Sequence, residues 1–343
     1  MSLPRTAPAA ETTPLPLSRP DRWHRPLIGL AIGMAVLSCV TGLLAILDPR
    51  EIHGQNAWFK PLKFALSIGI YAVTLAWLIG QVRRLRKAAN VIGTITVLAL
   101  VVEIAIIVGA AAFGTTSHFN VATPLNTTLW AVMAVSITVV WVATLVVGIA
   151  VALNPGPDAA RNLAVRAGVL IGFIGMGLAF LMTGPSEDQL NDFQGVAGAH
   201  AVGVDDGGAG LPFFGWSIEG GDLRIPHFIG IHALQAIPLG LLLIEVLSRR
   251  FLVLRDERVR IRLVLIGSLA FAAAVGIVTW QALIGEPIVA PSAPLLTASL
   301  VVILGTVGAV LAVLIRSARA LSQQATDPAQ TGASSLTADK ATP

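Results

Sequence analysis

Two histidines, His227 and His232, lie where a polar loop gives way to an apolar run, in the stretch GGDLRIPHFIGIHALQ. An imidazole can ligate a metal ion or haem iron, or it can exchange hydrogen bonds and protons. Burial without a partner is costly, so we expect each ring to be hydrogen-bonded or to hold a ligand. Gln235 follows His232 by three residues and shares its face of a helix, so a His232–Gln235 hydrogen bond is one alternative and ligation is the other.

Two further polar residues belong to an earlier apolar run. His118 follows that run, in GTTSHFN, and we expect it to lie at the height of His227 and to be its partner. The alternative for His118 is a helix-end histidine that is wetted by the membrane interface. Glu103 lies near the middle of the run, where a carboxyl group should be protonated, paired or part of a proton or cation path.

Three cations complete the candidate set. Lys60 and Lys63 begin another apolar run, on the side of the chain's topology where lysine is disfavoured, and Arg224 precedes the run with the two histidines. Basic side chains there predict an anionic neighbour. One alternative is a lipid phosphate or the nearby Asp48 and Glu51, and the other is a carboxylate or phosphate of a ligand.

Composition identifies the elements that must position these side chains. The chain has 343 residues, of which 55% are hydrophobic and 12% charged, and a soluble fold of that size needs more polar surface. We therefore predict an all-α integral membrane protein, a bundle of about eight transmembrane helices, from the runs long enough to cross about 30 Å of hydrocarbon. The runs lie near residues 27–47, 62–82, 91–113, 128–153, 163–184, 226–246, 262–284 and 294–316.

Three other segments accompany this bundle of residues 27–316. Residues 1–26 are rich in proline and arginine, and residues 317–343 are rich in Ala, Thr, Ser and Gln, so both are predicted to be disordered. The loop 185–224 is glycine-rich and too long for a simple connection. We expect it to fold as a cap over one end of the bundle.

Charge sets the predicted orientation. Most basic residues fall in loops that share one side if eight helices alternate, so the positive-inside rule puts both termini in the cytoplasm. Five of the six histidines and the loop 185–224 then lie at the extracytoplasmic end. The sequence pI of about 9.8 comes from these short loops, so we expect the lipid bilayer as partner and no nucleic acid. The single cysteine, Cys39, excludes a cysteine-built metal site.

Three stretches, KPLKFALS, TSHFN and GWSIEGGDLRIPHFIGIHALQ, resemble an uncharacterised group of bacterial multi-pass membrane proteins. The likeness spans most of residues 50–295, and the third stretch is its most specific part. The resemblance implies a multi-pass protein of the bacterial inner membrane. It brings no activity and no catalytic residue with it.

The leading hypothesis for function is a haem-binding or redox membrane protein with haem b at the extracytoplasmic end. Histidines on facing helices are the usual way in which a bundle holds haem iron, and basic residues suit the anionic propionates. The residues assigned to this site are His118 with His227 or His232 for the iron, and Lys60, Lys63 and Arg224 for the propionates.

Three alternatives stay open. A proton- or cation-coupled transporter would use Glu103, with Gln235 on its path, but the expected broken helices and internal repeats are not obvious. A copper or zinc site built from the outer histidines lacks close ligand spacing. A structural or assembly role would use the loop 185–224 as a docking surface.

Overall fold

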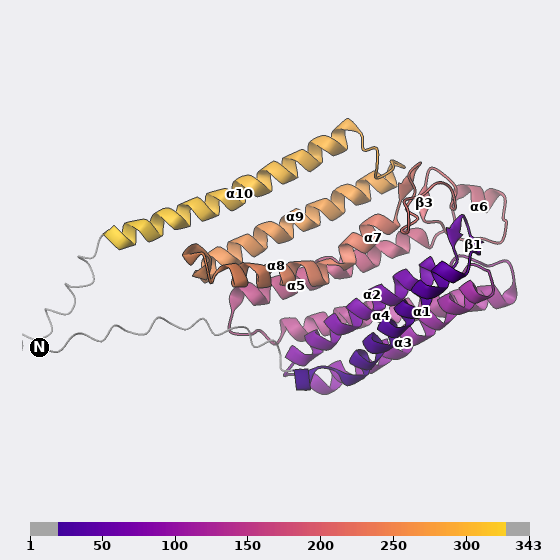
Figure 1. The fold of residues 1–343 in the computed structure, drawn as a ribbon, viewed down its shortest axis with the longest axis horizontal. Coiled ribbons are helices and arrows are strands. Elements are labelled where there is room, and N and C mark those ends of the chain that lie inside the picture. Colours follow the sequence, from indigo (N-terminus) through magenta and orange to yellow (C-terminus); the bar gives the residue numbers. More distant parts are fainter. Residues whose placement is uncertain (1–19, 327–343) are drawn as a thin grey trace, which may run out of the picture.

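The structure, a computed structural model, describes residues 20–326 and consists of long helices with short strands in the connecting loops (Figure 1). Seven of the described helices are long and apolar enough to cross a membrane, and the count is eight if a bent pair of helices is taken as one span. The predicted all-α membrane bundle is confirmed.

The helices form two groups. The first contains α1 (Arg25–Leu47), α2 (Phe59–Gln81), α3 (Arg86–Ala112) and α4 (Pro124–Ala152), which contact one another. In the second, α5 (Ala159–Gly177) contacts α7 (Arg224–Ile231), α8 (Ala233–Leu247) and α9 (Glu257–Leu283), and α10 (Ala293–Thr326) lies along α9 (Figure 1). The principal contact between the two groups is that of α4 with α5.

Local sequence explains where several helices begin. The side chains of His24, Thr123 and Asp158 precede α1, α4 and α5, and each accepts a hydrogen bond from a backbone N–H of the first helical turn. Both α1 and α4 also have a proline in the first turn. Proline is tolerated there because the backbone N–H that it lacks would have no partner within the helix.

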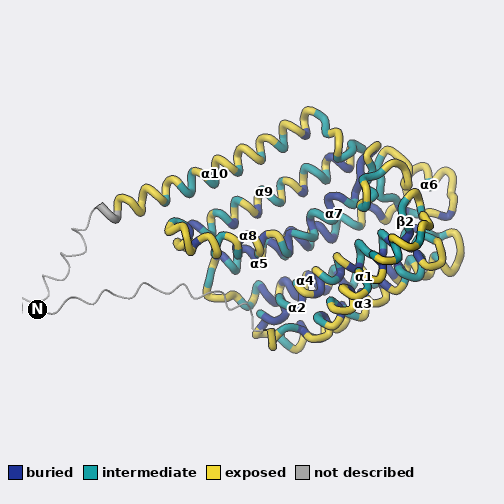
Figure 2. Tube along the Cα trace, viewed as in Figure 1, coloured by how far each residue is buried: buried dark blue, intermediate teal, exposed yellow. Residues whose placement is uncertain are grey.

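The outer faces of the helices are apolar. Figure 2 shows exposed residues along α10 and on the outside of the other helices, and they include large side chains such as Ile46, Leu98 and Val301. Such a surface is typical of helices that face lipid. A helix can lie in hydrocarbon because its backbone polar groups are hydrogen-bonded within the helix, and its side chains then need only be apolar. The protein is therefore a multi-pass membrane protein.

One end of the bundle carries a folded cap, which we define as residues 185–223. It contains α6 (Glu187–Asn191) and the antiparallel pair of β3 (Ala201–Val202) with β4 (Gly221–Asp222), and it lies beside the hairpin of β1 (Glu51–Ile52) and β2 (Gln55–Asn56) (Figure 1). The remaining short elements are the 3₁₀ helices η1 (Pro20–Arg22), η2 (Leu178–Met182) and η3 (Leu252–Arg255).

The sixth span differs from the regular helix predicted over residues 226–246. It begins at Arg224 and is broken into α7 and α8, which meet at His232 with a bend of 43°. Pro238 lies six residues further on, inside α8, where it removes the helical hydrogen bond to the carbonyl oxygen of Leu234. His232 itself lies at the junction of the bent pair.

Two predicted boundaries also move. Helix α10 runs to Thr326, beyond the predicted end at 316, because RSARALSQQA consists mostly of good helix formers. At the other end α1 begins at Arg25, so the leader predicted to be disordered through residue 26 is shorter. The rest of the predicted leader and tail, residues 1–19 and 327–343, lies outside the described residues.

Candidate functional site

A cavity of about 590 Å³ lies beneath the cap, and its lining comes from both helix groups, the cap and the loop between α3 and α4. This volume is within the range of about 300–1,000 Å³ that is typical of small-molecule sites. We call it the capped cavity. It brings together most residues of the candidate set, namely Lys60, Lys63, Glu103, His118, Arg224, His227 and His232.

Glu103 and His118 meet in the wall of this cavity. Glu103 Oε1 lies 3.8 Å from His118 Nε2, and Glu103 Oε2 is buried with no hydrogen-bond partner in the described part of the chain. His118 reaches inward because Gly114, with a φ of 70°, turns the chain back after α3. Ser117 Oγ holds the other ring nitrogen of His118 at 2.9 Å. The two residues form a buried acid–base pair that the sequence did not predict.

His227 has a different partner from the one predicted. Its Nδ1 donates a hydrogen bond of 2.9 Å to the carbonyl oxygen of Gly175 on α5, and not to His118. The expectation that His118 pairs with His227 is therefore wrong for hydrogen bonding, because Gly175 on α5 packs directly against Gly230 of α7 and brings its carbonyl oxygen to the ring. The bond leaves Nε2 of His227 as the ring nitrogen for a ligand or a proton.

His232 forms the predicted hydrogen bond with Gln235. Its Nδ1 donates to Gln235 Oε1 at 3.3 Å, and Gln235 Nε2 donates to Thr74 Oγ1 on α2 at 2.9 Å. Gln235 thus links the break in the sixth span to the first helix group. It is the one candidate residue that does not line the capped cavity.

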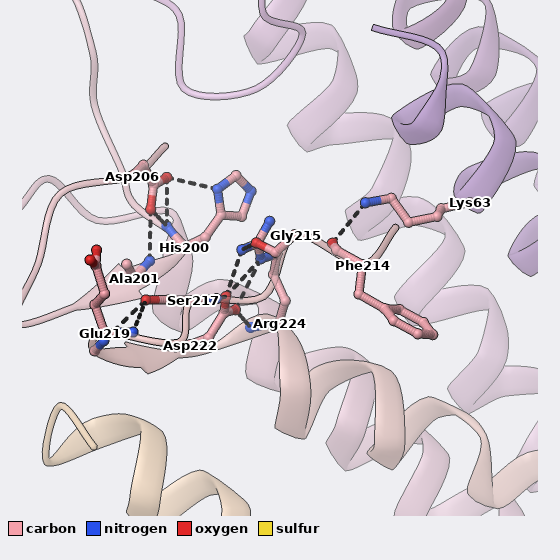
Figure 3. Close-up of polar contacts among 11 residues, drawn as sticks. Lys63, His200, Ala201, Asp206, Phe214, Gly215, Ser217, Glu219, Asp222 and Arg224 are labelled. Atoms are coloured by element: carbon pink, nitrogen blue, oxygen red, sulfur yellow. Dashed lines mark hydrogen bonds and ion pairs between the residues drawn. The ribbon is translucent and has the colours of Figure 1, made fainter. Parts of the chain in front are cut away.

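Two of the three cations have partners within the protein. Arg224 binds the buried Asp222, with Nε 2.9 Å from Oδ1, and also donates to the carbonyl oxygen of Gly215 (Figure 3). Lys63 Nζ donates to the carbonyl oxygen of Phe214 at 2.8 Å (Figure 3). Both contacts tie helix ends to the cap.

Lys60 is the exception. Among residues 20–326 no hydrogen bond or ion pair within 4.0 Å reaches its ammonium group, although it lines the capped cavity. The upstream Asp48, one predicted partner, instead binds Arg50 and accepts a hydrogen bond from the indole of Trp58. Among the described residues, no carboxylate is in direct contact with this cation, although Glu103 and Asp206 are near enough to interact with it electrostatically.

The cap is held by a second polar cluster that sequence reasoning missed. Asp206 accepts hydrogen bonds from His200 Nδ1 at 2.7 Å and from the backbone N–H of Ala201 at 2.8 Å (Figure 3). Burial lowers the pKa of His200 from its ordinary value, although the bond to Asp206 opposes that shift. Burial would raise the pKa of Asp206, but the hydrogen bonds from His200 and Ala201 outweigh it and hold this pKa well below its usual range. From sequence, Asp206 shows only as part of a glycine-rich turn.

Acid is expected to loosen the cap. Burial also lowers the pKa of His118 well below its ordinary value, with a contribution from the nearby Lys60. Since His118 and His200 stay neutral when folded but take up protons near about pH 6.5 when unfolded, stability falls as pH drops below that value, by up to about 1.4 kcal/mol per pH unit for each histidine. Asp206, whose folded pKa is lowered, adds a further loss below about pH 4.

Limited proteolysis of the cap checks this prediction. We expect faster cleavage at about pH 5.5 than at about pH 7.5 in the wild type and a smaller change in His200→Gln. Equal resistance of the wild-type cap at both pH values would contradict it.

The described residues offer no ligand set for a metal ion that is not part of a cofactor. No three His, Cys, Asp or Glu side chains in residues 20–326 lie close enough together to hold one. The predicted copper or zinc site therefore lacks the three or four protein ligands that such ions take.

The fold and the site together define a multi-pass, all-α membrane protein with a capped cavity that holds an unpartnered lysine and a buried acid–histidine pair. The chain matches no protein-family model, no curated protein and no solved structure. The resemblance to bacterial multi-pass proteins stays an expectation.

Proposed function

We propose that this protein binds an organic anion in the capped cavity, with Lys60 as the partner of the anionic group. The single observation that carries the proposal is Lys60, which lines the capped cavity and whose ammonium group has no hydrogen bond or ion pair within 4.0 Å among the described residues. An unpaired charge in such a place is costly, and an anionic ligand offsets that cost.

The surroundings of Lys60 favour an anion further. Lys60 lies in the first turn of α2, where backbone N–H groups and the helix dipole attract negative charge. Lys63 and Arg224 add positive potential around Lys60, against the negative potential of Glu103 and Asp206, and the carboxylate of Asp206 is already bound by His200. Apolar and aromatic side chains, including Phe64 and Trp130, form much of the remaining wall.

Haem b is one anion of this class. It is favoured by one observation, the hydrogen bond of His227 Nδ1 to the Gly175 carbonyl oxygen, because haem-ligating histidines are commonly oriented in this way and bind iron through Nε2. His118 is the weaker ligand candidate, since its Nε2 faces Glu103 and its Nδ1 contacts Ser117.

Transport is the second candidate function. The capped cavity is lined by both helix groups and by His232 at the broken span, and broken helices form substrate sites in many transporters. In this alternative Glu103, with His118, binds the coupled proton and the anion crosses between the two groups.

We also propose an orientation. Arg83, Arg84 and Arg86 lie at the end of the bundle opposite the cap, as do the basic residues between α8 and α9. By the positive-inside rule the cap is extracytoplasmic and both termini are cytoplasmic, in a bacterial inner membrane if the resemblance holds.

The proposal predicts a charge preference that depends on Lys60. In uncharged detergent, the fluorescence of the cavity tryptophans Trp130 and Trp216 is followed during titration with hexanoate and with hexanol. We expect hexanoate to bind about 10- to 100-fold more tightly in the wild type, because a charge-assisted hydrogen bond contributes about 1.5–3 kcal/mol. Lys60→Gln should bring the ratio close to one.

Lys63→Gln is the matched control, since that amine already donates to Phe214 and should affect the ratio less. Equal binding of acid and alcohol by the wild type, or an undiminished ratio in Lys60→Gln, would refute the anion site. An absorption spectrum is recorded first, because a Soret band that is lost in His227→Ala and kept in His118→Ala would identify haem as the resident anion.

A further inference from the structure

A second cavity, of about 280 Å³, adjoins the capped cavity deeper in the bundle. We call it the side chamber. The two share part of their walls, since Phe64, Glu103, Trp130, His227 and Phe228 line both. The cavities are therefore adjacent, with these residues in the wall between them.

The side chamber is more apolar than the capped cavity. Beyond the shared residues its wall consists largely of apolar side chains of α4, α5 and α7, such as Ala134, Met176 and Ile231. A ligand group that fills it gains little from hydrogen bonding and much from leaving water.

The side chamber also borders the outer surface of the bundle. Ile137 on α4 and Phe180 on η2 both line it, and they are 37% and 42% exposed. The wall between α4 and η2 is therefore the place where we expect a hydrocarbon chain to enter from the bilayer.

The position of the charged side chains indicates which end of a ligand would lie in each cavity. Glu103 lies where they join, with one carboxyl oxygen unpartnered, and Lys60 lines the capped cavity but not the side chamber. An anionic head is attracted to Lys60 in the capped cavity, which leaves the more apolar space past Phe64 and Trp130 to an uncharged part of the same molecule.

We propose that the ligand is a single-chain amphiphile from the membrane, with its anionic head beside Lys60 and its hydrocarbon chain in the side chamber. The inference rests on the proposed anion site and names the class of ligand. The head is a carboxylate or a phosphate, both of which a lysine ammonium binds.

A chain-length series tests the inference. Saturated fatty acids from butanoate to dodecanoate, and the matching alkyl phosphates to identify the head, are titrated against the wild type and against Ala134→Trp, which fills the side chamber but not the capped cavity. Comparing one ligand between two variants cancels its partition into detergent. The wild type should gain up to about fourfold in affinity for each methylene that is buried, until the chamber is full.

Ala134→Trp should bind butanoate as the wild type does and gain nothing from longer chains. Ala131→Trp, on the exposed face of the same helix, is the matched control and should follow the wild type. If tryptophan at 134 prevents folding, Ala134→Leu keeps the test and should reach its plateau at a shorter chain than the wild type.

The same chain-length dependence in the wild type and in Ala134→Trp would overturn the inference, as would a haem spectrum in the purified protein. The first result leaves the preference for hexanoate over hexanol intact, and the second leaves Lys60 as the partner of an anion, the haem propionate. Failure of the proposed function differs, because carboxylate and alcohol would then bind alike at every length.

Discussion

Gly175→Ala is expected to prevent α5 and α7 from packing and to unfold the bundle around the cavity. A Cβ atom at Gly175 would lie 2.5 Å from the Cα atom of Gly230, far inside van der Waals contact. Both atoms belong to helix backbones, so no side chain can turn aside to relieve the clash. We expect a loss of at least about 3 kcal/mol, at the upper end of overpacking effects.

The same substitution should displace His227, because the Gly175 carbonyl oxygen accepts its hydrogen bond. The measurement is the thermal unfolding midpoint of protein purified in detergent, together with its yield as a single species. Gly109→Ala is the matched control, since no atom lies within 4 Å of a Cβ at this membrane-helix position. Similar midpoints for Gly175→Ala and the wild type would show that the helices do not meet in this way.

Asp222→Ala is expected to release the cap from the helix ends. Asp222 is buried and binds the guanidinium group of Arg224, and it also accepts the backbone N–H of Ser217 at 2.8 Å (Figure 3). Removal of the carboxylate leaves Arg224 without its counter-charge in a largely enclosed place. Breaking a buried pair in this way costs about 3–5 kcal/mol.

Limited proteolysis within residues 185–223 and the unfolding midpoint measure the effect. We expect rapid cleavage of the cap in Asp222→Ala, whereas the exposed Glu219→Ala, three residues earlier, should behave like the wild type. Asp222→Asn should fall between them, because the amide keeps the shape and some hydrogen bonds but not the charge. An Asp222→Ala cap as resistant as the wild type would mean that this pair does not hold it.

Glycines on α5 allow the close helix packing on which the first of these predictions depends. The glycines Gly168, Gly172 and Gly175 lie on one face of α5, and each would place a Cβ atom within 3.0 Å of α7 or α8. Small residues at such spacing let membrane helices approach closely. That spacing is visible in the sequence and was the signal that sequence reasoning overlooked.

The sequence by itself determined the class of protein and predicted the end of the bundle at which the candidate residues lie. Apolar runs of membrane-spanning length specify the helices regardless of their neighbours, because hydrocarbon requires every backbone group to be bonded within its own segment. The same periodicity of runs and loops placed His118, His227, His232, Lys60 and Lys63 toward one end, where the capped cavity lies.

Only the tertiary structure decided which of those groups are partners. The contact of Glu103 with His118, the bond of His227 to Gly175 and the isolation of Lys60 depend on how two helix groups and the cap meet. Such contacts join residues far apart in the chain, and no local pattern encodes the distance between them. Periodicity specifies which face of a helix is apolar, whereas close packing between helices specifies where a cavity remains.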